Sequence, residues 1–265
     1  MTQPDFQTLA CSTPADHLLC VTLNRPEAAN AMNTQMGRDL LALFSGLILD
    51  TRGLRCVIIT GAGNRAFCAG GDLKERQGMT DETWEKQHAI FEQAVYAIMD
   101  CPVPVIAAIN GSAFGGGSEI ALAADFIHAA QSARFALTET SLGIIPGAGG
   151  TQTLARAVGT RRAKELILSA RPFTADQAHD WGMVNQVWPD EGLMDGVLAL
   201  AQRIAQNAPL AVRQAKRAIG LGFETDLKTG LGLEVEAYNR TIPSADRREG
   251  VLAFLEKRAP VFSGR

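Results

Sequence analysis

Short apolar segments that alternate with longer amphipathic ones are the feature that most constrains the fold of this 265-residue chain. The apolar segments lack period-two alternation, as expected of strands buried on both faces. They are Leu18–Leu23, Cys56–Thr60, Val105–Ile109 and Met183–Val187. Between them, apolar residues recur at helical spacing in Asn33–Leu49 and Glu82–Met99. This alternation predicts an α/β fold.

The pattern changes after about Gln206, where the strand-like segments stop. Three helical patterns follow, at Pro209–Ile219, Asp226–Tyr238 and Ala245–Arg258. We therefore predict a core over residues 1–205 and a helical C-terminal segment over residues 206–265. Such a segment needs a surface to pack on, supplied either by its own core or by a neighbouring subunit.

Composition excludes several classes of partner. A net charge of −3 and a pI near 5.8 provide no broad positive surface for nucleic acid or an anionic membrane. The five cysteines form no Cys-x-x-Cys pair, so we expect free thiols in a reducing compartment. The four histidines are scattered, and no metal site is expected. The first residues show no targeting pattern and no apolar stretch is long enough to span a membrane, which predicts a cytoplasmic protein.

Two glutamates each lie beside a glycine-rich turn. Glu119 ends the segment Asn110–Glu119, and Glu139 precedes the glycine-rich residues 144–150, in which Pro146 is expected to stiffen the loop. Carboxylates held near backbone that only glycine can shape suggest paired acid–base chemistry beside exposed N–H donors. Either glutamate alone would more simply be a surface residue, so the hypothesis depends on the surrounding turns.

Two glycine turns follow neighbouring strands. Ala69–Asp72 comes after the strand Cys56–Thr60, while Gly115–Gly117 comes after Val105–Ile109 and begins a helix. If these strands are parallel neighbours, both turns lie at one edge of the sheet. Two backbone N–H groups could then converge on one oxygen, the second reinforced by the positive end of the helix. This arrangement is an oxyanion hole, in which each donor contributes about 3 kcal/mol to transition-state stabilisation.

Two other interpretations of the glycines are weaker. Gly61–Ala66 matches the dinucleotide-binding fingerprint after a strand, but no amphipathic helix follows to receive a pyrophosphate. Ser118 lacks the closing glycine of a nucleophile elbow, which disfavours a serine hydrolase.

The motifs together resemble those of the crotonase (enoyl-CoA hydratase/isomerase) family over essentially the full chain. Four motifs in order carry this resemblance: Leu23–Ala31, Ala66–Lys74, Asn110–Glu119 and Glu139–Gln152. Glu139–Gln152 and Arg161–Arg171 look most like the methylglutaconyl-CoA hydratase branch. The resemblance implies a spiral of strand–strand–helix turns with a helical C-terminal trimerisation segment, assembled as a homotrimer or a dimer of trimers.

Family roles can be carried onto matching residues. The N–H groups of Gly71 and Gly116 match the oxyanion donors, and Glu119 and Glu139 match the two glutamates that handle water in family hydratases. Contact with the coenzyme A thioester is implied for eight residues: Arg25, Ala31, Ala69, Asp72, Leu73, Lys74, Phe254 and Lys257. Ala69 resembles the residue whose carbonyl reads the adenine amino group, and Lys74 the cation that meets a phosphate. Asp72 is expected mainly to cap or brace its turn.

Two residues of the C-terminal segment, and one position that differs from some relatives, complete the expected binding site. Phe254 and Lys257 match positions that reach a neighbouring subunit's ligand in family trimers. Glu27 stands where some relatives place a lysine toward the phosphates, so binding should depend more on Lys74, Arg25 and Lys257. Some residues of Met79–Met99 are expected to line the acyl pocket, although Trp84, Phe91 and Met99 are assigned first to the core.

The resemblance predicts an enoyl-CoA hydratase that needs no cofactor besides the coenzyme A of its substrate. We expect ionised Glu119 to accept a proton from water while protonated Glu139 supplies one toward C2. Family members that shift a double bond or cleave their substrate often keep one of these glutamates or neither, so an isomerase or another acyl-CoA lyase is the main alternative. The acyl group, and with it a place in fatty acid or branched amino-acid degradation, stays open.

A second class of alternative is RNA binding, which some methylglutaconyl-type relatives perform through a lysine-rich helix. The corresponding segment, Asn33–Asp50, contains Arg38 but no lysine, and Asp39 offsets that one cation. The phosphate contacts that RNA binding needs are not supplied there, so no nucleic-acid partner is expected.

Overall fold

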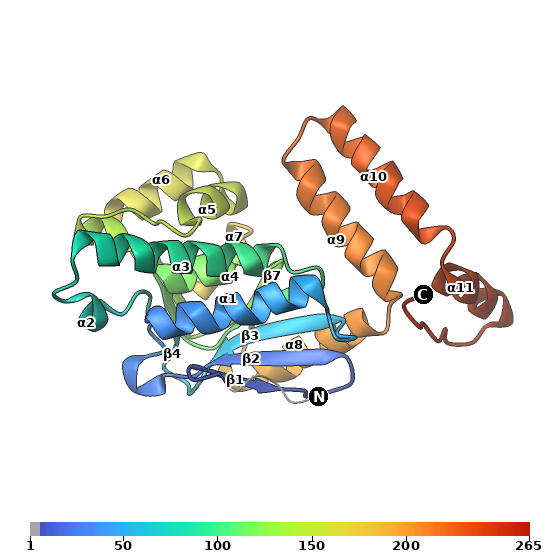
Figure 1. Ribbon diagram of the computed structural model, residues 1–265, viewed down its shortest axis with the longest axis horizontal. Coiled ribbons are helices and arrows are strands. Elements are labelled where there is room, and N and C mark those ends of the chain that lie inside the picture. Colours follow the sequence, from blue (N-terminus) through green and yellow to red (C-terminus); the bar gives the residue numbers. More distant parts are fainter. Residues whose placement is uncertain (1–5) are drawn as a thin grey trace.

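The computed structural model describes residues 6–265 and consists of two sheets with helices around them, followed by a projecting helical arm (Figure 1). The larger sheet has six strands in the order β1-β2-β3-β5-β7-β10. Its bounds are β1 Leu9–Ser12, β2 Leu18–Leu23, β3 Cys56–Gly61, β5 Val105–Ile109, β7 Phe126–Ala130 and β10 Gln186–Trp188. β1 pairs antiparallel with β2, and the other neighbours pair in parallel. The predicted α/β fold is therefore confirmed.

The smaller sheet shows how the chain spirals. Its four strands, in the order β4-β6-β8-β9, are β4 Ala66–Cys68, β6 Ser112–Phe114, β8 Arg134–Ala136 and β9 Phe173–Thr174. Each turn of the chain gives one strand to the larger sheet and the next to the smaller one, as in β3–β4, β5–β6 and β7–β8, before a helix follows. This is the spiral of strand–strand–helix turns that the sequence motifs predicted.

Three of the four predicted strands are confirmed, and the fourth is displaced. Met183 and Val184 do not begin a strand, because both of their N–H groups donate to the carbonyl of Ala178 at the end of helix α7 (Ala175–Asp180). The strand β10 starts only at Gln186. Both side chains are buried, so an apolar run that covers the core beneath a helix end has the same sequence pattern as a strand.

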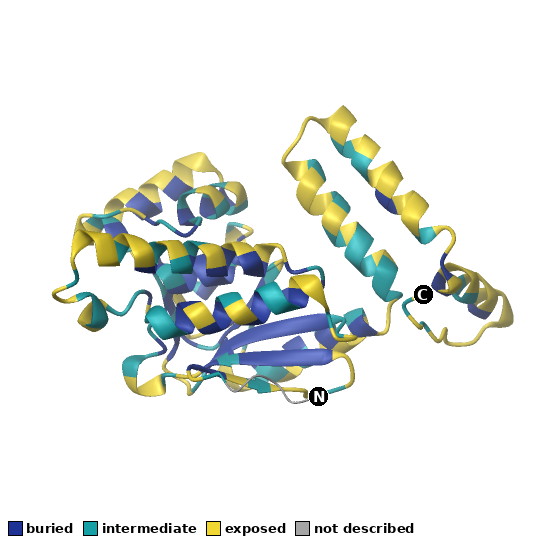
Figure 2. Cartoon of the chain, viewed as in Figure 1, coloured by how far each residue is buried: buried dark blue, intermediate teal, exposed yellow. Residues whose placement is uncertain are grey.

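Helices α1 (Thr34–Leu49) and α3 (Asp81–Met99) pack against each other beside the sheets, and α8 (Leu193–Ala205) packs along β2, β3, β5, β7 and β10. The apolar stripe of α1 is buried, and Figure 2 shows buried residues recurring along this helix between exposed ones. Asn33 begins α1 by accepting a hydrogen bond from Met36 N–H, and Thr80 begins α3 in the same way through Thr83. The remaining helices of the body are α2 Leu73–Arg76, α4 Gly116–Ala123, α5 Gly150–Val158 and α6 Thr160–Ser169.

Two residues assigned to the core lie elsewhere. Met99 is the last residue of α3 and is 44% exposed, and Trp84 in the first turn of the same helix is only partly buried. Both follow the helical spacing of the stripe, but they lie at the two ends of the helix. Phe91, near the middle of α3, is buried as predicted.

The C-terminal helices form the projecting arm. They are α9 (Pro209–Phe223), α10 (Leu227–Thr241) and α11 (Ala245–Glu256), and α9 and α10 pack as an antiparallel pair (Figure 1). An ion pair of 2.6 Å between Lys216 and Asp125 joins α9 to the body. The division at residue 205 stays a prediction; α8 ends at Ala205 and α9 begins at Pro209.

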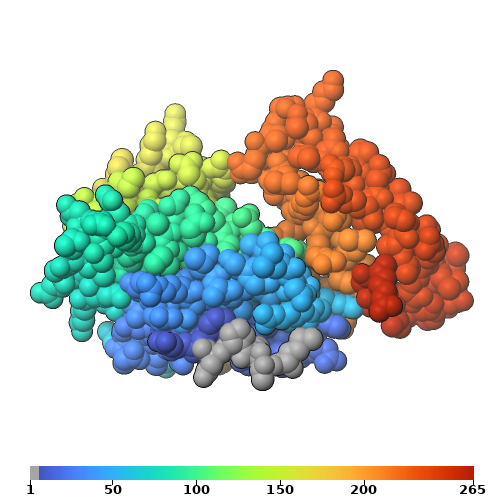
Figure 3. All heavy atoms as spheres, viewed as in Figure 1, coloured from blue at the N-terminus to red at the C-terminus, as the bar shows by residue number. Residues whose placement is uncertain are grey.

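Figure 3 shows the arm as a lobe that stands off the body. Many of the arm's large apolar side chains are exposed. Large apolar residues at least 43% exposed on this arm are Ile219, Leu221, Phe223, Leu227, Leu231, Val235, Tyr238, Ile242, Val251, Leu252, Phe254, Leu255 and Val261. Within residues 6–265, no helix is both long enough and apolar enough to cross a membrane.

The cysteines are free thiols in the structure, and all but Cys11 are buried. Burial raises the pKa of Cys56 to about 12 and that of Cys68 to about 11. Buried thiols of this kind behave as small apolar side chains rather than nucleophiles.

Candidate active site

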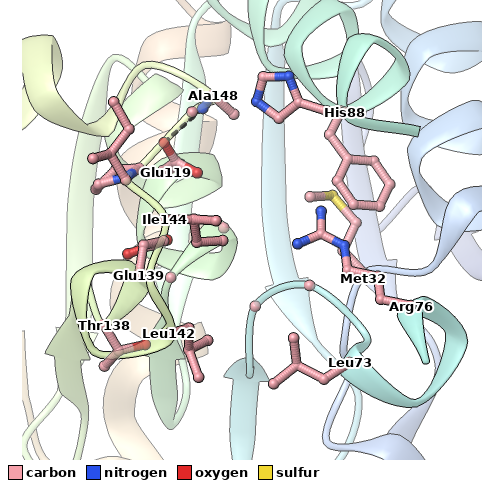
Figure 4. Close-up of a pocket in the computed structure, with 18 of the residues that line it drawn as sticks. Met32, Leu73, Arg76, His88, Glu119, Thr138, Glu139, Leu142, Ile144 and Ala148 are labelled. Atoms are coloured by element: carbon pink, nitrogen blue, oxygen red, sulfur yellow. Dashed lines mark hydrogen bonds between the residues drawn. The ribbon is translucent and has the colours of Figure 1, made fainter. Parts of the chain in front are cut away.

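A cavity of about 770 Å³ opens where the two sheets, α2, α3 and the loop before α5 meet (Figure 4). Its walls combine glycine turns, two carboxyl groups and a mainly apolar surface. The lining residues are Met32, Ala69, Gly70, Gly71, Leu73, Arg76, Trp84, His88, Phe91, Gly115, Gly116, Glu119, Thr138, Glu139, Leu142, Ile144, Ile145, Pro146, Gly147 and Ala148.

The two glycine turns lie backbone against backbone on one wall. A Cβ on Gly70 would come within 2.8 Å of the Phe114 carbonyl oxygen, and one on Gly117 would collide with the carbonyl of Cys68. Gly70 has a φ of +94°, which favours glycine on conformational grounds as well. Glycine is therefore required for the turns to approach this closely.

This approach brings the N–H groups of Gly71 and Gly116 together. A Cβ built on Gly116 lies 3.9 Å from the Gly71 nitrogen. Among residues 6–265, neither N–H donates to another protein group. Gly116 is also the first residue of α4, so its N–H lies at the positive end of that helix. Both residues line the cavity.

Glu119 lies on α4 and is 5% exposed. Its Oε1 accepts hydrogen bonds from the N–H groups of Ala148 at 2.7 Å and Gly150 at 2.9 Å. Glycine at 150 makes room for this contact, because a Cβ there would lie 3.0 Å from the Glu119 carboxyl. Burial raises the pKa of Glu119, while the two N–H donors and nearby His88 act in the opposite direction. These two donors stabilise the ionised form.

Glu139 is the first residue of the short helix η2 (Glu139–Leu142) and is 8% exposed. Burial, together with the negative charge of Glu119, raises its pKa to about 7, against the pull of Arg76. Its Oε2 accepts no hydrogen bond from residues 6–265. A Cβ on Gly115 would lie 2.9 Å from the Glu139 Oε1, so the carboxyl sits against the second glycine turn.

The two carboxyl groups lie on the same side of the cavity, facing Met32, Leu73 and Arg76 (Figure 4). Their charges interact, so the protons they release belong to the pair. Glu139 is the member that keeps its proton nearer neutral pH, because Glu119 has two N–H donors and Glu139 Oε2 has none. The two carboxyl groups thus lie in different hydrogen-bonding environments.

The residues expected to contact coenzyme A do not all line the cavity. Ala69 and Leu73 line the cavity, and Lys74 is exposed on α2 nearby. Arg25 is already engaged: its Nη1 donates to the Ala31 carbonyl at 2.6 Å and to Asp72 at 2.9 Å.

Asp72 also caps α2, accepting hydrogen bonds from the N–H groups of Lys74 and Glu75, as predicted. Phe254 on α11 is 83% exposed, and Lys257 ends that helix. Neither lines the cavity, and α11 and α2 lie at opposite ends of the chain's structure (Figure 1).

Several cavity residues were not identified from the sequence. Trp84, His88 and Phe91 project from one face of α3, at spacings of four and three residues, and Arg76 ends α2. The sequence feature that could have revealed His88 is its imidazole, which interrupts an otherwise apolar stripe of α3. It fits against Gly147, where a Cβ would collide with its ring. Arg76 had no such signal, because its helix has only four residues.

The chain matches a family model described as "Enoyl-CoA hydratase/isomerase" over residues 15–265. It is 41% identical over 251 residues to the human mitochondrial methylglutaconyl-CoA hydratase, covering 93% of this chain and 74% of that protein. It is 40% identical over 238 residues to the short-chain-enoyl-CoA hydratase of Clostridium acetobutylicum, covering 90% and 91%. A crystal structure of an enoyl-CoA hydratase from Bacillus anthracis superposes with a TM-score of 0.96 at 44% identity, covering 98% of this chain and all of that one.

Proposed function

Because the chain belongs to the enoyl-CoA hydratase/isomerase family, as its motifs predicted, and is an enzyme that acts on acyl-CoA thioesters, we propose that it adds water reversibly across the 2,3 double bond of a 2-enoyl-CoA. The observation that carries this proposal is the pair Glu119 and Glu139, buried on one side of a cavity whose wall also holds the N–H groups of Gly71 and Gly116. One carboxyl group can accept a proton from the attacking water while the other donates a proton to the substrate.

The two N–H groups polarise the substrate. With the thioester oxygen against Gly71 and Gly116, negative charge that develops as water attacks C3 is stabilised on that oxygen. Each donor contributes about 3 kcal/mol in the transition state, since both are fixed before the substrate arrives. The close backbone packing of the two turns supplies this preorganisation.

The two glutamates divide the proton transfers. Ionised Glu119, held by two N–H groups, removes a proton from the water as its oxygen bonds to C3. Protonated Glu139, with a pKa of about 7, delivers its proton to C2. The turnover leaves Glu119 protonated and Glu139 ionised, and proton exchange restores both. No group besides the coenzyme A of the substrate is needed for this chemistry.

The reaction type is tested with a panel of straight-chain, branched and carboxylated 2-enoyl-CoA thioesters, followed by loss of the conjugated double bond and by mass spectrometry. We expect products heavier than the substrate by one water, and none from Glu119→Gln on the same timescale. Products of unchanged mass would identify a double-bond isomerase, and shorter acyl products a different lyase. Wild-type hydration rates in Glu119→Gln and Glu139→Gln would refute the assigned roles.

We also propose that the exposed apolar arm is covered by other copies of the chain. The arm presents thirteen large apolar side chains to solvent in the single chain, far more than isolated surface residues. Phe254 and Lys257 lie on this arm, distant from their own cavity, which supports a role at a neighbouring subunit's coenzyme A. A trimer or hexamer in light scattering is expected, and a stable monomer would refute both the assembly and these two roles.

A further inference from the structure

An arginine lies opposite the two carboxyl groups, and the proposed water addition assigns it no contact with the substrate. Arg76 is the last residue of α2 and is partly buried, beside Met32 and Leu73 on the cavity wall (Figure 4). Its guanidinium carbon is 3.3 Å from the position a Cβ would take on Gly71. The cation is therefore next to the proposed oxyanion donor, within the space that the acyl group would occupy.

Neighbouring side chains hold this guanidinium in one orientation. Its Nε donates to Gln87 Oε1 at 2.8 Å, and the guanidinium carbon lies 4.3 Å from the centre of the Trp84 ring. Gln87 is fixed in turn, because its Nε2 donates to Glu75 at 2.7 Å and to Thr34 at 2.8 Å. Stacking on an aromatic ring stabilises the cation and orients its plane.

The outer edge of the same guanidinium has no hydrogen-bond partner in the part of the chain that the structure describes. Within residues 6–265, Nη1 and Nη2 donate no hydrogen bond, and Arg76 forms no ion pair shorter than 4.0 Å. Burial lowers the pKa of Arg76, but an arginine stays charged at neutral pH. A partly buried cation with two unused, parallel donors matches the bidentate geometry of a carboxylate.

The structure assigns to Arg76 the recognition of a second carboxylate, borne on the acyl group of the substrate. The preferred substrates are then short 2-enoyl-CoA thioesters that end in a carboxylate, rather than uncharged enoyl chains. This inference deepens the proposed function and rests on the thioester binding in the cavity. A purely structural Arg76, stacked on Trp84 to end α2, would show no such preference.

Binding of unreactive thioesters tests the assignment apart from catalysis. Glutaryl-CoA and pentanoyl-CoA have the same chain length and differ in the terminal carboxylate, so calorimetric Kd values isolate the contribution of that group. We expect wild-type protein to bind glutaryl-CoA about tenfold or more tightly than pentanoyl-CoA. Arg76→Met should abolish the preference, and Arg76→Lys should retain part of it, because lysine keeps the charge without the fork. Lys86→Met, on the exposed side of α3, is the control for removal of a cation.

Equal binding of the two thioesters by wild-type protein would overturn the inference. It would also be overturned if Arg76→Met weakened both thioesters equally, because the arginine would then serve the shared coenzyme A or the fold. The unfolding midpoint of Arg76→Met is measured alongside, and Arg76→Lys supplies the second variant if the methionine destabilises the protein.

Kinetics separate this inference from the proposed function. Glutaconyl-CoA and pent-2-enoyl-CoA are the corresponding reactive pair. We expect Arg76→Met to reduce kcat/KM for glutaconyl-CoA about 30-fold more than kcat/KM for pent-2-enoyl-CoA, because any effect of the lost cation on Glu139 is common to both substrates. Hydration of both with no Arg76-dependent preference would refute the carboxylate assignment alone. An Arg76-dependent preference in binding without hydration of either would refute the hydratase proposal alone.

Discussion

Replacing Glu139 with glutamine should remove activity and stabilise the protein above neutral pH. The buried carboxyl has a folded-state pKa of about 7 against an ordinary value of 4.5, because burial and the charge of Glu119 disfavour its ionised form. In the unfolded chain it ionises at the lower value. As pH rises between the two values, the unfolded state loses this proton first, and the folded protein loses stability.

The expected magnitude follows from the separation of these pKa values. One pH unit corresponds to 1.36 kcal/mol, so ionisable Glu139 destabilises the folded protein by about 3 kcal/mol above pH 8, with nearly no effect below pH 4.5. Glutamine has nearly the same shape and cannot ionise. Glu139→Gln should therefore gain up to about 3 kcal/mol over wild type at pH 8.5, and this gain should disappear toward pH 4.5.

The assay is urea unfolding of both proteins at matched protein concentration, at half-unit steps from pH 4.5 to 8.5. Glu85→Gln on the exposed side of α3 is the matched control, and its difference from wild type should stay flat across the range. A Glu139→Gln difference equally flat with pH would refute the claim that burial holds a proton on this carboxyl. The same variant should lose hydration activity by about 100-fold or more.

The other predictions concern the base, the oxyanion donors and the arm. Glu119→Gln should lower kcat by about 100- to 10,000-fold while coenzyme A thioesters still bind, checked by stopped-flow kinetics and calorimetry. Gly116→Ala should lower kcat by about 100-fold, because the added Cβ would lie 3.2 Å from Met32 and 3.9 Å from the nitrogen of the other proposed oxyanion donor, Gly71. Gly46→Ala is the control: a Cβ there has space around it, so this variant should keep wild-type kinetics. Phe223→Asp on the arm should reduce the assembly to smaller species in light scattering, and an unchanged mass would contradict the proposed contact.

Much of the fold could be predicted from local patterns. Strands buried on both faces leave continuous apolar runs, and β3 and β5 are parallel neighbours. The turns of Gly71 and Gly116, however, directly follow β4 and β6 of the smaller sheet, two short strands that were not predicted. The predicted start of the fourth strand was wrong, because Met183 and Val184 cover the end of α7 instead. Only the tertiary packing reveals this.

The glycine turns and the two glutamates of the cavity could be located from the sequence, but the side chains around them could not. Arg76, Trp84 and Gln87 form a contact network across two helices, and nothing in their local sequence indicates that these helices meet. Arg25 is a further case: the motif suggested a contact with coenzyme A, and the sequence did not show that its Nη1 donates to Asp72 and to the Ala31 carbonyl. Such partners depend on tertiary structure, which residue spacing does not report.

The reaction proposed for this cavity is the addition of water to a 2-enoyl thioester. The most direct measurement is incubation of the thioester panel in water enriched in oxygen-18, with mass spectrometry of the acyl products from wild type and Glu119→Gln. We expect one heavy oxygen on C3 of a 3-hydroxyacyl-CoA, formed by wild type and not by the variant. Products without the label, or labelled product formed at equal rates by both proteins, would contradict it.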